Sequence, residues 1–155
     1  MMNIQFDKRK EFIPLILILV LVFTRLIPHP PNFTPIIAVG LMSGYLFQNL
    51  NFSMIVLLTV MIFSDLIIGF HGSMFFVYIS LLIIQTYFFK KFVSINYLKI
   101  SLYALAASTV FFIISNFGVW LTGNLYPKNL NGMIICYTMA LPFFKNTIFS
   151  TLIYS

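Results

Sequence analysis

The sequence is short of charged residues. Only 8% of its 155 residues are charged, nine basic and three acidic, whereas a soluble protein has about 25%. So few charges do not cover a soluble surface, and 61% of the residues are hydrophobic. Six membrane helices of about 20 residues each would use roughly 120 residues and leave roughly 35 for turns and tails. We therefore expect an all-α membrane protein with six transmembrane helices and no large soluble domain.

The sequence also lacks the motifs of common catalytic and metal sites. Its single cysteine, Cys136, excludes an internal disulfide. The phosphate-binding lysine loop, G-x-S-x-G and H-E-x-x-H are absent, and two of the three acidic residues, Asp7 and Glu11, lie near the N-terminus. We expect no enzyme activity and no cofactor. Nine scattered cations do not form the continuous basic surface that nucleic-acid binding needs.

Apolar segments between the charged and proline-rich stretches predict the six spans. They lie at about residues 12–27, 35–47, 53–69, 74–89, 98–121 and 133–154, in a single integral membrane domain of residues 1–155. These runs are too long, and alternate too little, for membrane barrel strands. The prolines of residues 28–35 exclude regular helix and predict a stiff connector. Pro142 should break the last helix.

The basic residues predict how the chain is oriented. With the N-terminus in the cytoplasm, the cytoplasmic segments hold Lys8, Arg9, Lys10, Lys90, Lys91 and Lys99. The opposite side holds Lys128 and, at the membrane edge, Arg25. This distribution agrees with the positive-inside rule and predicts that both termini are cytoplasmic. The basic lead is also typical of a signal peptide, but no small-residue cleavage site follows, which favours a retained helix.

Three charged residues remain in or beside the spans: Arg25, Asp65 and Lys145. A charge inside the bilayer costs several kcal/mol, so each needs a partner, a wet cavity or a short path to the interface. Counting along the helices puts Arg25, Asp65 and Asn116 in the outer half. Arg25 either pairs with Asp65 or extends to the outer headgroups. Lys145 lies midway along its span, and a substrate anion, a proton step and a pair with Asp65 all remain open.

Other polar residues extend this candidate site. Asn116 and Trp120 share one helix face at i, i+4 spacing, which suits either a wet cavity wall or an interfacial tryptophan belt. His29 and His71 lie in connections expected on the outer side. Because no pair of ligands has i, i+4 spacing, we expect no metal site.

Gly40 and Gly44 form a small-xxx-small pattern in the second predicted span. Small residues at this spacing let helices approach closely in membranes. The pattern suits helix packing within the chain or docking to another subunit, and the sequence leaves both open.

Four blocks of the sequence resemble a known family. They are Arg25-Leu-Ile-Pro-His-Pro-Pro-Asn-Phe-Thr-Pro35, Ser64-Asp65 with Ile68-Gly69-Phe70-His71, Ser115-Asn-Phe-Gly-Val-Trp120 with Thr122-Gly123-Asn124-Leu-Tyr-Pro127, and Leu141-Pro-Phe-Phe-Lys-Asn-Thr147. Along nearly the whole chain they are similar to an uncharacterised family of small bacterial membrane proteins described only as transport proteins. More distantly, the six-helix pattern resembles the S components of energy-coupling-factor vitamin transporters.

The resemblance implies an outward-facing pocket with the first external connector as its lid, and a small-residue helix face that docks on a membrane coupling subunit with ATPases. It carries over to these pocket or lid candidates: Arg25, His29, Asn32, Asp65, His71, Asn116, Trp120 and Lys145. The expected function is binding of a small polar or anionic solute from the outer side for uptake. A non-transporting membrane subunit that scaffolds a partner complex is the alternative. A lipid-modifying enzyme would need Asp65, His71 and Lys145 within hydrogen-bond reach in one cleft.

Overall fold

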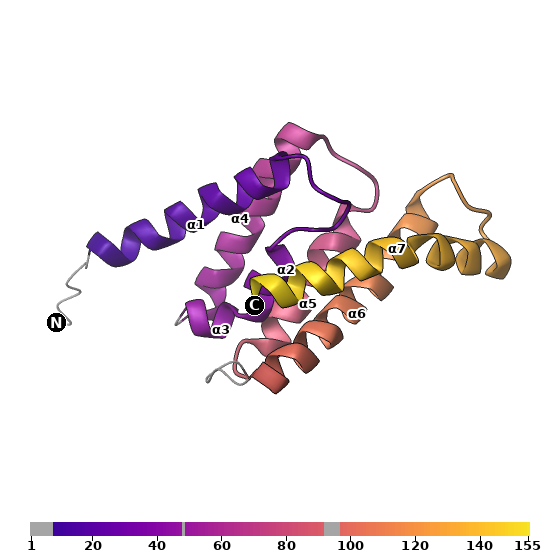
Figure 1. Ribbon diagram of the computed structural model, residues 1–155. Coiled ribbons are helices and arrows are strands. Elements are labelled where there is room, and N and C mark those ends of the chain that lie inside the picture. The colour runs from indigo at the N-terminus through magenta and orange to yellow at the C-terminus, as the bar shows by residue number, and fades with distance from the viewer. Residues whose placement is uncertain (1–7, 48, 92–96) are drawn as a thin grey trace.

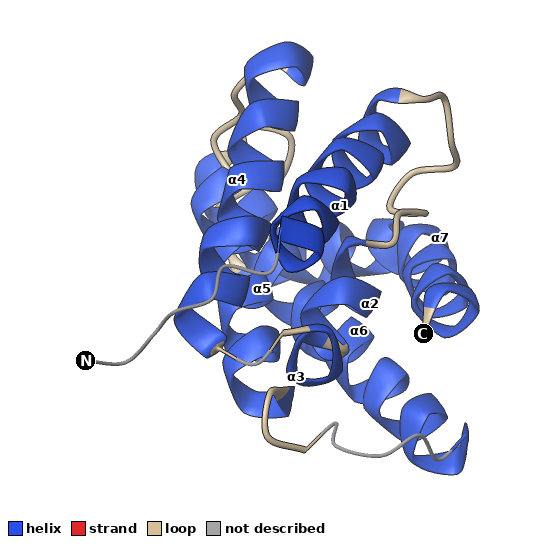
Figure 2. Ribbon diagram, turned by 90° about the vertical axis from the view of Figure 1, so that its left-hand side faces the viewer, coloured by secondary structure: helices blue, strands red, loops and turns tan. Residues whose placement is uncertain are grey.

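The computed structural model describes residues 8–47, 49–91 and 97–155, with side chains in the first helix described from Ile16 onward, and these residues form only helices, turns and loops (Figure 2). The helices are α1 (Lys8–Leu26), α2 (Ile36–Leu41), α3 (Ser43–Leu46), α4 (Leu50–Ile68), α5 (Met74–Phe88), α6 (Tyr97–Thr122) and α7 (Leu130–Tyr154). The all-α prediction is confirmed for the described residues. The connections between the second and third predicted spans and between the fourth and fifth include residues outside these ranges.

Local sequence signals determine where α4 and α7 begin and where α4 ends. The Asn49 side chain accepts a hydrogen bond from the Phe52 N–H at 3.1 Å, and Asn129 accepts one from the Gly132 N–H at 2.8 Å. Both are N-caps that satisfy a free backbone donor of the first turn. Gly69 ends α4 at φ 108°, a conformation that glycine adopts without a Cβ clash. This ending leaves Asp65 in the last turn of α4.

Three helices have the length and apolar character needed to cross a membrane. They are α4, α6 and α7, with 19, 26 and 25 residues. The apolar part of α1 that is described, Ile16–Leu26, and α5 are shorter. Three candidate spans in the described residues indicate a membrane protein, but they are fewer than the six that we predicted.

The single helix predicted at residues 35–47 is wrong. The chain forms two short helices, α2 and α3, because Met42 between them leaves helical geometry with φ −84° and ψ 6°. The next residues pack tightly on the end of α5. A Cβ placed on Gly44 would lie 1.6 Å from the Phe89 carbonyl oxygen, so this contact accounts for the glycine at position 44.

The predicted break at Pro142 is also wrong. Helix α7 continues through Pro142 to Tyr154. Proline removes one backbone hydrogen bond, but membrane helices tolerate it where neighbouring groups hold the helix in place. Helix α7 packs along α6 and also contacts α2.

The helices pack in a chain of neighbours around α2. Helix α1 lies beside α4, α4 contacts α5, α5 packs on α6, and α6 packs on α7 (Figure 1). The short helix α2 contacts α5, α6 and α7, and its Ile36, Ile37 and Leu41 are buried in the main apolar core. The last turns of α1 and α4 lie at the same end of the molecule (Figure 1). This end carries the candidate site.

Gly40 and Gly44 provide a matched pair of substitutions for testing this packing. We expect Gly44→Ala to destabilise the protein by about 1–3 kcal/mol, because the new methyl group would overlap the Phe89 backbone. Gly40→Ala is the control, since its Cβ would lie 3.9 Å from Leu57 Cδ2, an ordinary contact. Thermal unfolding in mild detergent measures both. Equal melting temperatures would show that the close contact of Gly44 with α5 is not formed.

Candidate functional site

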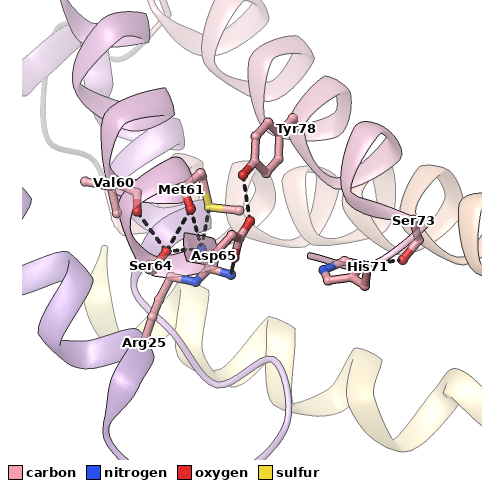
Figure 3. Close-up of polar contacts among 8 residues, drawn as sticks. All are labelled: Arg25, Val60, Met61, Ser64, Asp65, His71, Ser73 and Tyr78. Atoms are coloured by element: carbon pink, nitrogen blue, oxygen red, sulfur yellow. Dashed lines mark hydrogen bonds and ion pairs between the residues drawn. The ribbon is translucent and has the colours of Figure 1, made fainter. Parts of the chain in front are cut away.

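An ion pair joins the ends of α1 and α4. Arg25 Nη2 lies 2.8 Å from Asp65 Oδ1, and the Tyr78 hydroxyl donates to the other carboxylate oxygen, Oδ2, at 2.6 Å (Figure 3). The Arg25 side chain is 15% exposed and that of Asp65 is 2% exposed. We expected Arg25 either to pair with Asp65 or to extend to the outer headgroups, and in the structure it pairs with Asp65.

The remaining contacts of Arg25 also come from α4. Its Nη1 donates to Ser64 Oγ and lies 3.5 Å from the Met61 carbonyl oxygen and 3.2 Å from Met61 Sδ (Figure 3). Met61, Ser64 and Asp65 follow one another at i, i+3 and i+4, which places them on one face of the helix. The sequence of α4 thus supplies acceptors for both terminal nitrogens of the Arg25 guanidinium group.

A cavity of about 490 Å³ lies beside this pair. Its lining comes from α1, α2, α4, α5, α6 and α7 and from the loops around them. The polar side chains that line it include Arg25, His29, Asn32, His71, Ser73 and Asn116. The apolar ones include Ile37, Met61, Val77, Leu81, Phe111 and Phe143. The cavity is therefore mainly apolar, with a few polar groups, as is typical of small-molecule sites.

The proline-rich connector forms a wall of this cavity. Its Pro31 carbonyl accepts a hydrogen bond from Asn146 Nδ2 at 3.1 Å, and its Asn32 carbonyl accepts one from Ser150 Oγ at 3.4 Å. Phe33 packs edge-on against Tyr154, with ring centroids 6.1 Å apart. Asn32 adopts φ 61°, a left-handed conformation that asparagine tolerates better than most residues. These contacts fasten the connector along α7.

Several lining residues are positioned by hydrogen bonds of their own. Asn116 Nδ2 donates to the Phe112 carbonyl at 2.8 Å, and the Cys136 thiol lies 3.6 Å from the Asn116 carbonyl. His71 Nδ1 lies 3.0 Å from Ser73 Oγ. His29 Nδ1 lies 2.8 Å from the Pro30 carbonyl, which only accepts, so this nitrogen carries the proton. Within the described residues, no three His, Cys, Asp or Glu side chains gather in a group that would hold a metal ion.

The structure brings most of the predicted site residues together. Arg25, His29, Asn32, His71 and Asn116 line the cavity, and Asp65 lies directly behind Arg25. The sequence predicted that Arg25, Asp65 and Asn116 lie near one another, because counting along three different helices puts them at a similar depth in the membrane.

Trp120 and Lys145 are not among the residues that line the cavity. Trp120 Nε1 donates to the Pro127 carbonyl at 2.9 Å, and Lys128 Nζ lies 5.9 Å from the centre of its ring. Trp120 therefore holds the loop after α6. Lys145 is exposed on α7, and the partner of Asp65 is Arg25.

The sequence left open whether Gly40 and Gly44 serve packing within the chain or docking to another subunit. Their contacts in the structure fit packing within the chain. Gly40 is buried, and a Cβ placed on it would lie nearest to Leu57. A Cβ placed on Gly44 would overlap the backbone of Phe89. Both contacts are made within the chain.

Sequence reasoning missed Tyr78 and Ser64, which complete the ion-pair cluster. Ser64 precedes Asp65, and its helical spacing to Met61 was a usable signal. Tyr78 lies 13 residues beyond Asp65, on α5, and its contact depends on how α4 and α5 pack. No spacing rule within one helix would have found it.

A double-mutant cycle tests the ion pair. We expect Arg25→Met to destabilise the protein by about 3–5 kcal/mol, because it leaves the buried Asp65 carboxylate without its cation. The double variant Arg25→Met/Asp65→Leu should regain much of this loss, since an apolar pair leaves no buried charge. Chemical unfolding in mild detergent measures the four proteins of the cycle. Additive effects of the two single substitutions would contradict a direct pair.

Comparison with known proteins places the chain in a family. No curated protein and no solved structure matches it. Residues 6–155 match the sequence pattern of a group described as "Family of unknown function (DUF6580)". The match covers nearly the whole chain and includes all seven described helices. The chain therefore belongs to the DUF6580 family.

Proposed function

We propose that this protein is a six-span protein of the bacterial inner membrane that binds a small polar or anionic solute from the outer side, as the substrate-binding component of an uptake system. The cavity beside the Arg25–Asp65 pair is the observation that carries the proposal. Its volume of about 490 Å³ lies within the range of small-molecule pockets. Its walls come from segments far apart in the sequence, as expected of a solute site at the centre of a bundle.

The path of the chain supports six crossings. Arg25 contacts Asp65, so α1 and α4 end on the same side. The chain must therefore return over the length of α4, whose 19 residues extend about 28 Å, before α4 begins. The connector, α2 and α3 together make this crossing. Irregular backbone at membrane depth is tolerated where it lines a cavity, and Pro31, Asn32 and Thr34 line this one.

The distribution of lysines supports an outward-facing cavity. Lys90 and Lys91 follow α5, and Lys99 lies in the first turn of α6, at the ends of these helices away from His71 and Asn116. By the positive-inside rule this end is cytoplasmic. The cavity end, which includes His71, then faces outward, and solute would enter from there.

Cysteine labelling tests this orientation. Cys136 is the single cysteine, so Cys136→Ser gives a background on which Asn124→Cys and Lys90→Cys are introduced at exposed positions. We expect a membrane-impermeant maleimide to label Asn124→Cys in intact spheroplasts and Lys90→Cys only after the membrane is opened. Labelling in the reverse order would overturn the assigned orientation.

Solute binding itself is tested by blocking the cavity. Ala140 lines it and is 5% exposed, so Ala140→Phe would fill part of the space. We expect small molecules identified by mass spectrometry to copurify with the wild type in mild detergent and to be lost from Ala140→Phe. Ile135→Phe is the matched control, because Ile135 is 50% exposed on the same helix and lies outside the lining. If nothing copurifies with the wild type beyond a mock purification, the proposed function is wrong.

A scaffolding subunit is the second candidate, and Lys145 favours it. Lys145 is exposed on α7 near Leu141 and Phe149, which are 48% and 60% exposed. A lysine on an apolar membrane-facing surface is costly, and a carboxylate on a partner's helix would offset that cost. A stable complex of fixed stoichiometry with a membrane protein outside transport, together with an empty cavity, would favour this function. The glycine pair does not support docking, because both glycines pack inside the chain.

A further inference from the structure

The charge balance around the cavity narrows the class of solute. Among the described lining residues, Arg25 alone carries a formal charge when the histidines are neutral. That charge is already matched by Asp65, and the contacts of the guanidinium with Met61 and Ser64 hold it against α4. An anion in the cavity would therefore meet a cation whose charge is already balanced.

Displacing Asp65 to free Arg25 for an anion would be unfavourable. Asp65 is 2% exposed, and its second oxygen accepts the Tyr78 hydroxyl at 2.6 Å. Breaking the pair would leave a buried carboxylate without its cation, which costs several kcal/mol. A cationic solute is no better accommodated, since no carboxylate belongs to the cavity lining in the described part of the chain.

Two uncharged polar side chains of the lining keep hydrogen-bond acceptors that a neutral molecule can use. His29 holds its proton on Nδ1 toward the Pro30 carbonyl, so Nε2 is left as an acceptor in the neutral ring. Asn116 uses Nδ2 on the Phe112 carbonyl, which leaves Oδ1 as an acceptor. Val77, Leu81 and Phe111 add apolar wall. Such walls fit the apolar body of a solute, and the acceptors fit its N–H or O–H groups.

We propose that the solute is an uncharged amphipathic molecule, with an apolar or aromatic body and a few hydrogen-bonding groups. This inference rests on the proposed function and narrows its polar or anionic solute to a neutral one. The Arg25–Asp65–Tyr78 cluster excludes ions by keeping the cavity wall electrically balanced.

The copurification experiment tests this inference directly. Compounds that are released from the wild type and lost from Ala140→Phe are identified by mass spectrometry, and their charge at pH 7 is assigned from their structures. Neutral compounds support the proposal. Anionic or cationic compounds would overturn it while leaving solute binding intact, whereas the absence of any compound would overturn solute binding itself.

A second experiment tests the role of Asp65 with benzoate as the anionic probe. Asp65→Asn preserves the shape of the side chain and leaves the Arg25 charge unbalanced. We expect benzoate to bind this variant more tightly than the wild type by roughly tenfold or more, as a single charge-assisted contact allows. Binding is measured by calorimetry in mild detergent.

The double variant Arg25→Met/Asp65→Asn is the matched control, because it removes both charges. It should lose the benzoate affinity that Asp65→Asn gains. Benzoate binding to the wild type as tight as to Asp65→Asn, or no gain in a folded Asp65→Asn protein, would contradict the proposed exclusion of anions. The mass-spectrometric result on the wild type holds whether or not these variants fold.

Discussion

The ion pair between Arg25 and Asp65 is the interaction on which the rest of the structure depends. It links the last turns of α1 and α4 through two residues that are 40 positions apart in the chain. Helix α1 packs chiefly on α4, so the pair holds the end of a helix that has few other neighbours. Met61 and Ser64 accept hydrogen bonds from Arg25, and the Tyr78 hydroxyl donates one to Asp65. These contacts fit the rule that a buried charge is retained only when it is paired and hydrogen-bonded.

This pair also determines the path of the chain and the character of the cavity. Because α1 and α4 end together, the connector, α2 and α3 lead the chain back from that end toward the start of α4. That irregular stretch is hydrogen-bonded to α7 and supplies Asn32 and Thr34 to the cavity wall. The same ion pair balances the charge of Arg25, so one contact relates the path of the chain to the charge balance of the cavity wall.

The sequence predicted the features that depend on local composition and spacing. Long apolar runs predicted the all-α fold, and equal depth related Arg25 to Asp65 before any contact was known. The interruption of the helix at Met42 was not predicted, because no proline or glycine stands at that position. The packing of Gly44 against Phe89 could not be predicted either, because it depends on tertiary contacts. Lys145 was predicted to belong to the site from its position midway along its span. The sequence did not show which face of the helix carries it, and in the structure it lies on the exposed face. Depth follows from counting residues, whereas direction follows from tertiary packing.

Solid-state NMR of the protein in lipid, with ¹⁵N in the arginine side chains and ¹³C in the aspartate carboxyl groups, tests the central claim most directly. The chain's other arginine and aspartate are Arg9 and Asp7, so the spectrum contains few candidate pairs, and Asp65→Asn identifies the signal from Asp65. The account predicts a dipolar contact between the Arg25 guanidinium and the Asp65 carboxyl carbon, consistent with the nitrogen–oxygen distance of 2.8 Å. A spectrum in which no arginine signal depends on Asp65 would contradict it.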